Sequence, residues 1–219
     1  MSPPPTGFAG PLNGALPAAR QSRICGGRWI AITVLALLTG CASIQPPAPS
    51  IVSVDAWGGT PASAPVPTHR ISKITLHHQG EVWKDGADVE AYLRRLQQWS
   101  RLTKRWADIP YHYVIAPDGR IYAARPLTQA GDTNTEYDPR GHALVMLVGN
   151  FEEQQPTPAQ LGAAVELTAW LAREHRLGLD DIASHKDYSA QTVCPGKHLY
   201  AHLESGWFRA EVRRRLQAP

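Results

Sequence analysis

The distribution of proline limits which part of this chain can fold. Of its 19 prolines, 11 lie before Ile71, and residues 42–68 are rich in Pro, Ala and Ser. A segment of this composition buries too little apolar surface to order itself and is typical of a semi-extended linker. Within it, residues 51–58 (IVSVDAWG) can pack locally against a folded part. The 219 residues therefore predict one domain, at 69–219, which is long enough to bury a hydrophobic core.

The first forty residues have the layout of a secretory signal. They carry three arginines and no acidic residue, and the arginines precede the ten-residue apolar run Trp29–Leu38. Ten residues are too few to span a bilayer as a helix, and a basic stretch followed by an apolar one indicates a signal peptide. The sequence LTGC, which ends at Cys41, resembles the lipobox of bacterial lipoproteins, in which the cysteine thiol is acylated and the chain is cleaved directly before that cysteine. We therefore expect a signal peptide at 1–40 and a lipid anchor at Cys41. A plain signal peptide with an incidental cysteine is the alternative.

Removal of this signal changes the charge and cysteine content of the chain. The whole chain has a formal net charge of +3, but without residues 1–40 it has 19 basic and 19 acidic residues. A neutral chain gives no reason to expect a nucleic-acid partner. Cys25 is lost with the signal and Cys41 is used for the anchor, which leaves Cys194. Ala42 stands where an aspartate is associated with inner-membrane retention in enterobacteria. We therefore expect anchoring in the outer membrane, facing the periplasm.

Short β-prone runs alternate with helical patterns after residue 70. Strands are predicted at Ile71–Leu76, Tyr111–Ala116, Arg120–Ala123, Ala143–Val148 and Ile182–Ser184. The second and third flank a Pro-Asp-Gly turn, which favours a hairpin. The fourth is a continuous apolar run, suited to a strand that is buried on both faces.

Three helices are predicted between and after these strands. Asp85 or Asp88 caps the first, whose apolar residues follow the 3.6-residue period: Val89, Tyr92, Leu93, Leu96 and Trp99. The sequence TPAQ at 157–160 is a capping box that begins a second helix, which Gly178 ends. A third covers Ala201–Leu216. This mixture predicts an α/β domain with a central mixed sheet flanked by helices.

Groups that can bind a metal lie at the ends of predicted strands. His77 and His78 follow the first strand, His185 follows the last, and Cys194 lies nine residues further on. Zinc takes imidazole and thiolate ligands, and a catalytic zinc site uses three protein ligands and a water molecule. From spacing alone, two alternatives stay open: these side chains never meet, or Cys194 is a nucleophile. No local sequence pairs Cys194 with an obvious base.

Seven motifs follow one another along the chain: ITLHH at 74–78, DIPYHY at 108–113, PDGRIY at 117–122, GNF at 149–151, QPT at 155–157, SHKD at 184–187 and TVCPG at 192–196. In this order they resemble the zinc-dependent N-acetylmuramoyl-L-alanine amidases of type 2, a family that includes the peptidoglycan recognition proteins. The resemblance runs from about Ile71 to Trp207. It implies an amidase or recognition-protein fold.

The resemblance also implies a ligand set, in which zinc is held by His77, His185 and Cys194. Relatives in the cytoplasmic recycling branch carry a glutamate in the central strand and an aspartate as third ligand. This chain has Met146 at about the first position and Cys194 at the second. It is therefore more similar to the branch that relies on a tyrosine.

By the same resemblance, Tyr111 and Thr192 are the expected catalytic residues. Tyr111 matches the tyrosine that positions or polarises the attacking water and the substrate, and Thr192 stands where relatives carry lysine or threonine. The implied reaction is hydrolysis, by zinc-activated water, of the amide between the lactyl group of N-acetylmuramic acid and L-alanine in peptidoglycan or muropeptides. A non-catalytic peptidoglycan-binding module is the alternative, and such relatives commonly lack the cysteine. A zinc hydrolase of another amide is a third possibility.

The remaining histidines and tryptophans are expected to be structural. Surface or hydrogen-bonded positions are predicted for His69, His142, His175, His198 and His202, and a structural position for His112. Trp99, Trp106 and Trp170 fit helical core positions better than a sugar-stacking platform.

Overall fold

The computed structural model describes residues 47–62, 66 and 68–218. The expected signal peptide and Cys41 lie outside the described residues.

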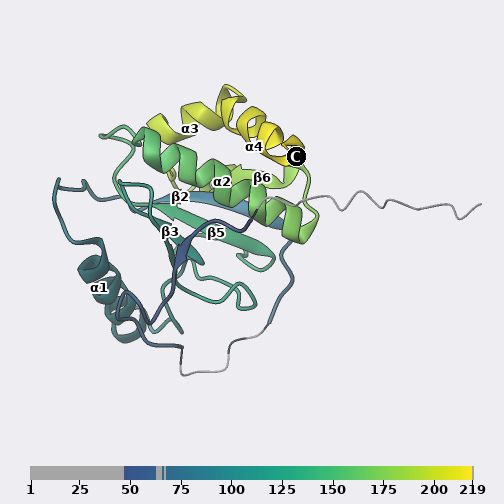
Figure 1. Cartoon of the computed structure of the whole chain (residues 1–219). Coiled ribbons are helices and arrows are strands. Elements are labelled where there is room, and N and C mark those ends of the chain that lie inside the picture. Colours follow the sequence, from purple (N-terminus) through teal and green to yellow (C-terminus); the bar gives the residue numbers. More distant parts are fainter. Residues whose placement is uncertain (1–46, 63–65, 67, 219) are drawn as a thin grey trace, which may run out of the picture. The chain divides into compact units, whose positions relative to one another are not determined.

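A six-stranded mixed sheet forms the centre of the domain (Figure 1). The strand order is β1-β4-β3-β5-β2-β6. The strands are β1 (Ile51–Val52), β2 (Lys73–His78), β3 (Tyr113–Ile115), β4 (Ile121–Ala123), β5 (His142–Leu147) and β6 (Ile182–Ser184). Strand β2 is parallel to its neighbours β5 and β6, whereas β3 and β4 form the antiparallel hairpin. The expected α/β fold with a central mixed sheet is confirmed.

Helices cover both faces of this sheet. Helices α2, α3 and α4 lie over one face and α1 lies on the opposite side (Figure 1). The helices are α1 (Val89–Leu102), α2 (Pro158–His175), α3 (Lys197–Glu204) and α4 (Trp207–Gln217), with 3-10 turns at Leu179–Asp181 and His185–Asp187. Along β2, Ile74 and Leu76 enter the core beneath α2. Because side chains alternate along a strand, His77 points to the face that α1 covers.

The starts of the first two predicted helices are confirmed, but the predicted end of the second helix and the single C-terminal helix at Ala201–Leu216 are wrong. Asp88 caps α1 by accepting a hydrogen bond from the Ala91 amide at 3.0 Å, and the capping box at 157–160 begins α2. Helix α2 ends at His175, where Arg176 adopts a left-handed conformation, rather than at Gly178. The predicted C-terminal helix is two helices, α3 and α4. They are separated at Gly206, whose φ of 77° a non-glycine residue adopts only with strain.

The folded domain begins earlier than residue 69, which corrects the predicted boundary. Strand β1 pairs in parallel with β4, and Trp57 is fully buried. The indole Nε1 of Trp57 donates a hydrogen bond to the Ala123 carbonyl at 2.7 Å. Residues 51–58 therefore belong to the domain, because Ile, Val and Trp supply the apolar surface that the flanking Pro/Ala/Ser-rich residues lack.

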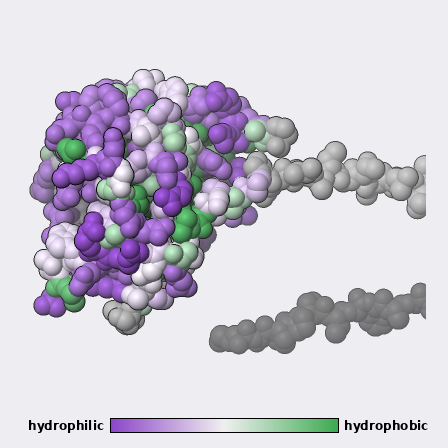
Figure 2. Space-filling view, turned by 60° about the vertical axis from the view of Figure 1, so that its left-hand side comes forward, coloured by the Kyte–Doolittle hydropathy of each residue, from purple (hydrophilic) through white to green (hydrophobic). Residues whose placement is uncertain are grey.

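The surface on the side brought forward in Figure 2 is mainly hydrophilic, with apolar residues in small separate patches. Among the described residues, no helix combines the length and the apolar character needed to cross a membrane.

Candidate metal centre and active site

Three side chains from distant parts of the sequence meet at one edge of the sheet. His77 lies near the C-terminal end of β2, His185 directly follows β6, and Cys194 lies in the loop before α3. One ligand atom from each lies within 4.8 Å of the other two. Strands β2 and β6 are parallel neighbours, so their C-terminal ends meet at the same edge, where α/β sheets commonly bind ligands. The structure thus brings together the three predicted ligands.

The geometry of this cluster fits a tetrahedral metal site. The Sγ atom of Cys194 lies 3.5 Å from Nδ1 of His77. Zinc bonds of about 2.3 Å to sulfur and about 2.0–2.1 Å to nitrogen place two tetrahedral ligands roughly 3.5 Å apart. The other ring nitrogen of His77, Nε2, is buried and has no hydrogen-bond partner within the part of the chain that the structure describes. The donor set and its spacing both suit a zinc ion.

Burial sets the protonation of the three candidate ligands. It lowers the pKa of His77 well below its usual value, an effect that His185 reinforces, and it also lowers the pKa of His185. Both imidazoles are therefore neutral at pH 7 and offer a lone pair. Burial raises the pKa of Cys194 to about 12, although an N–H···S bond from the His78 amide at 3.4 Å opposes this shift. The thiol needs a cation beside it to ionise, as a bound metal provides.

Backbone constraints hold Cys194 toward the two histidines. The Cys194 carbonyl accepts a hydrogen bond from the Lys186 amide at 2.8 Å, which ties the cysteine loop to the turn after His185. Two residues later, Gly196 has a φ of 86°, and a Cβ there would lie 2.4 Å from the carbonyl carbon of Phe151. Only glycine fits so close an approach to another backbone, which explains the Cys-Pro-Gly sequence.

The two predicted catalytic residues both line the pocket at this cluster. The ring centroid of Tyr111 lies 5.1 Å from that of His77. Burial raises the pKa of Tyr111 well above its usual value, and nearby Cys194 adds to the shift, so the phenol is a hydrogen-bond donor at neutral pH. The Thr192 hydroxyl accepts a hydrogen bond from the Cys194 amide at 3.1 Å. Its proton remains free for donation, and the catalytic role of Thr192 stays a prediction.

A groove extends from the cluster toward α1. A pocket of about 350 Å³ contains the three candidate ligands. It continues into a pocket of about 400 Å³, and the two share Gln79, Trp106, Tyr111 and Asn134. Trp99 lines the second pocket and is 44% exposed. The expected core positions of Trp99 and Trp106 are therefore wrong. Trp170 does pack on the core, with its ring edge against Tyr113.

The prediction for Trp99 is wrong because of the way helix α1 packs on the domain. The buried stripe of α1 runs through Val89, Leu93, Gln97 and Ser100. Gln97 is only 6% exposed because its amide binds Asp108 and Thr60. Gln97, a polar residue, thus occupies the core-facing position on α1, and Trp99 faces the groove.

The other histidines lie outside the metal cluster, as predicted. His112 is buried, with Nδ1 accepting from the Leu144 amide and Nε2 bonded to the Gln129 carbonyl. The Nδ1 atom of His142 is bonded to the Thr75 hydroxyl. His78 is a neighbour of the cluster rather than a member, because its Nδ1 accepts from the Phe151 amide at 3.2 Å.

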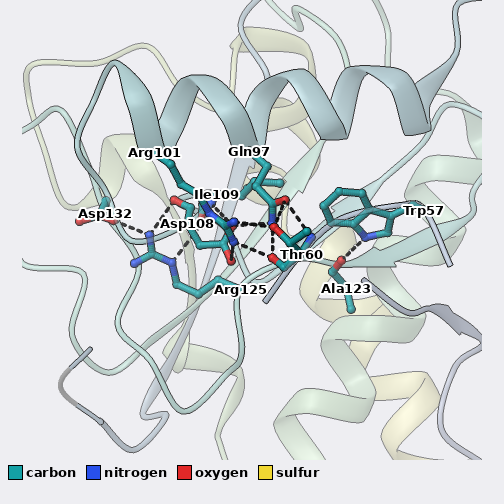
Figure 3. Close-up of polar contacts among 9 residues, drawn as sticks. All are labelled: Trp57, Thr60, Gln97, Arg101, Asp108, Ile109, Ala123, Arg125 and Asp132. Atoms are coloured by element: carbon teal, nitrogen blue, oxygen red, sulfur yellow. Dashed lines mark hydrogen bonds and ion pairs between the residues drawn. The ribbon is translucent and has the colours of Figure 1, made fainter. Parts of the chain in front are cut away.

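A buried arginine, Arg125, holds a segment that lines the pocket (Figure 3). Arg125 is 3% exposed and donates to the carbonyls of Asp108, Ile109 and Ala130 and to the carboxylate of Asp132. The first two carbonyls precede Tyr111, Ala130 lies two residues before the pocket-lining segment 132–135, and Asp132 is the first residue of that segment. One guanidinium therefore sets the spacing between Tyr111 and this segment.

The same polar network reaches the N-terminal part of the domain (Figure 3). The Asp108 carboxylate, 2% exposed, accepts hydrogen bonds from Gln97 and Arg101, both at 2.9 Å. Gln97 and Arg101 also donate to the Thr60 carbonyl. Residues 57–60 are thus attached to α1 through side chains, beside the Trp57 bond to Ala123.

A family model described as N-acetylmuramoyl-L-alanine amidase matches residues 67–197, which is more than half of the chain. The chain belongs to this amidase family.

The relatives of this chain include both peptidoglycan-recognition proteins and N-acetylmuramoyl-L-alanine amidases. Peptidoglycan-recognition protein SD of Drosophila simulans is 27% identical over 184 residues, covering 80% of this chain and 94% of the relative. The crystal structure of Drosophila peptidoglycan recognition protein SD matches with a TM-score of 0.64 at 27% identity, covering 72% of this chain and 94% of that one. The endolysin N-acetylmuramoyl-L-alanine amidase LysCS from Clostridium intestinale matches with a TM-score of 0.57 at 26% identity, covering 74% and 97%.

Sequence reasoning missed several residues of this site, most of them in the segment 131–141. Asp132, Asn134 and Thr135 line the pocket, and the ring of Tyr137 packs against that of His185 at 5.0 Å. Thr135 Oγ1 lies 2.8 Å from His185 Nε2. This segment has neither a helical nor a strand period, so no pattern in it indicates which side chains reach the site.

Proposed function

We propose that the protein is a zinc-dependent peptidoglycan amidase. It cleaves the bond between the lactyl carbonyl of N-acetylmuramic acid and the amino group of L-alanine, in cell-wall turnover or remodelling. The observation that carries the proposal is the complete set of His77, His185 and Cys194, spaced as zinc ligands, beside a protonated Tyr111 in one groove. Membership of the amidase family and the match to an endolysin amidase support it.

The chain's own residues suit each step of this hydrolysis. Zinc held by the three ligands would lower the pKa of a water molecule and polarise the scissile carbonyl. The Tyr111 hydroxyl donates a hydrogen bond to the oxyanion that develops as the water oxygen bonds to the carbonyl carbon. As the C–N bond breaks, the alanine nitrogen takes up the proton that the attacking water gives up, and the Thr192 hydroxyl at the pocket can relay this proton. The groove past Trp106 and Trp99 holds the rest of the substrate.

Digestion of purified peptidoglycan with the zinc-loaded protein tests this function. Mass spectrometry of the soluble products should show stem peptides with a free L-alanine amino group and glycan chains that lack peptides. Stoichiometric binding to peptidoglycan without release of peptides would instead identify a recognition module. Cleavage at any other amide would support the proposal of a hydrolase but contradict the proposed site of cleavage.

We also propose that Cys41 is lipidated and that the enzyme faces the periplasm from the outer membrane. The LTGC sequence after a basic and an apolar stretch supports this placement. Because β1 begins at Ile51, only residues 42–50 separate the anchor from the domain, and a fully extended chain of this length spans about 30 Å. The amidase would therefore work close to the membrane surface. Incorporation of labelled palmitate should require Cys41, and incorporation that persists in Cys41→Ala would refute the anchor.

A further inference from the structure

Within the irregular segment 131–141, the side chain of Thr135 makes a polar contact with His185, a proposed zinc ligand. Its Oγ1 lies 2.8 Å from Nε2 of His185. The same oxygen lies 2.9 Å from Oγ1 of Thr133, which also accepts a hydrogen bond from the Thr135 amide at 3.1 Å. The hydroxyl groups of Thr135 and Thr133 therefore link the His185 imidazole to the loop through hydrogen bonds.

Anchors on both sides of Thr135 hold this arrangement in place. Three residues before it, the Asp132 carboxylate is paired with the buried guanidinium of Arg125. One residue after it, the Glu136 carboxylate accepts a hydrogen bond from the Ser189 hydroxyl at 2.6 Å. These two contacts hold the backbone on both sides of Thr135, which places its hydroxyl beside His185.

The contacts of Thr135 are compatible with a tautomer of His185 that leaves Nδ1 for the metal, because Thr135 occupies Nε2. Thr135 can donate its hydroxyl proton to Thr133, and its lone pair then accepts from an N–H at Nε2 of the imidazole. A neutral histidine with its proton on Nε2 presents the lone pair of Nδ1. Metal-ligating histidines commonly donate their second N–H in this way, and the partner fixes the orientation of the ring.

We propose that Thr135 is a positioning residue that holds His185 as the Nε2–H tautomer, with Nδ1 directed to the metal. This inference rests on the metal centre of the proposed function. It concerns a residue that the sequence motifs of the site do not include.

Zinc affinity of three variants tests the inference independently of hydrolysis. Affinity is measured by competition with a chelating dye on the full domain, and the cobalt-substituted proteins give a visible spectrum that reports ligand geometry. Thr135→Val, which keeps the shape but loses the hydroxyl, should weaken zinc binding about 10–100-fold and alter the cobalt spectrum. Thr135→Ser, which restores the hydroxyl, should stay within about threefold of wild type. Thr133→Val disturbs the same loop but keeps the bond to His185, and its effect should be clearly smaller than that of Thr135→Val.

The outcomes separate this inference from the proposed function. Wild-type affinity in Thr135→Val, or equal losses in Thr135→Val and Thr133→Val, would overturn the positioning role even if the wild type cleaves peptidoglycan. A loss specific to Thr135→Val in a protein that binds zinc but cleaves nothing would support the role and reject the enzyme. If Thr135→Val is unfolded by circular dichroism, Thr135→Ala supplies the same comparison with Thr135→Ser.

Discussion

The two sides of the active-site pocket are built in different ways. On one side, His77 lies on β2, the strand between β5 and β6, and its position follows from the backbone ladder. On the other side, segment 131–141 lies outside the helices and strands and is held by side chains, chiefly Arg125 and Ser189. Residues 57–60 are held in the second way as well, through Trp57 and Gln97. The side of the pocket that segment 131–141 forms therefore depends on a few side-chain polar contacts rather than on secondary structure.

Arg125→Met gives the largest expected loss of stability and tests this dependence most strongly. It removes the partner of Asp132 and leaves three carbonyls without their donor. A buried acceptor left without its donor costs about 1–3 kcal/mol, so the three carbonyls together predict a loss of roughly 3–5 kcal/mol, to which the partly exposed Asp132 adds little. Chemical denaturation should show this decrease in the free energy of unfolding. Arg140→Met removes an exposed pair with Asp138 and serves as the control, with no measurable change expected. Equal stability of the two variants would contradict a structural role for the Arg125 network.

Trp57→Ala tests whether the N-terminal segment is part of the folded unit. Trp57 is fully buried, and truncation of a buried tryptophan to alanine costs about 3–5 kcal/mol. Urea denaturation of the variant should show this loss. Trp207 is 39% exposed, and Trp207→Ala should lose much less. If Trp57→Ala is as stable as wild type, residues 51–58 behave as a linker after all.

Tyr111→Phe separates catalysis from metal binding in this pocket. Removal of one donor to a developing oxyanion costs about 10²–10³-fold in kcat. Zinc content should be unchanged, since Tyr111 is not among the proposed ligands. Tyr113→Phe is the matched control, because Tyr113 packs on the opposite face of the sheet against Trp170. An unchanged kcat in Tyr111→Phe would remove Tyr111 from the catalytic residues.

The same difference explains what the sequence could and could not predict. His77 and His185 were candidate ligands because apolar runs mark the strands and the histidines stand at or directly after their ends, and the resemblance to the amidase family then implied the ligand set. The buried polar network was not predicted, because Gln97 and Asp108 look like surface residues until their partners are known. The short strand β1 was also missed, since two residues next to a Pro/Ala/Ser-rich stretch carry almost no periodic signal.

Trp99→Ala gives the smallest expected effect and tests the groove beside α1. Trp99 packs edge-on against Trp106, with Lys104 beside both rings. An aromatic contact of this kind contributes about 0.5–1.5 kcal/mol, so KM for a soluble muropeptide should rise by up to about tenfold with kcat unchanged. Steady-state kinetics measure both values. An unchanged KM would show that the substrate does not reach Trp99.

The central claim is that three residues from the sheet edge and the cysteine loop form a catalytic zinc centre. Measuring zinc content and peptidoglycan hydrolysis in the same preparations tests this claim most directly. Wild-type protein should contain one zinc ion per chain and release stem peptides. Cys194→Ala should contain no stoichiometric zinc and release none, because two neutral imidazoles alone do not complete the site. Full hydrolysis by metal-free Cys194→Ala protein would contradict the account.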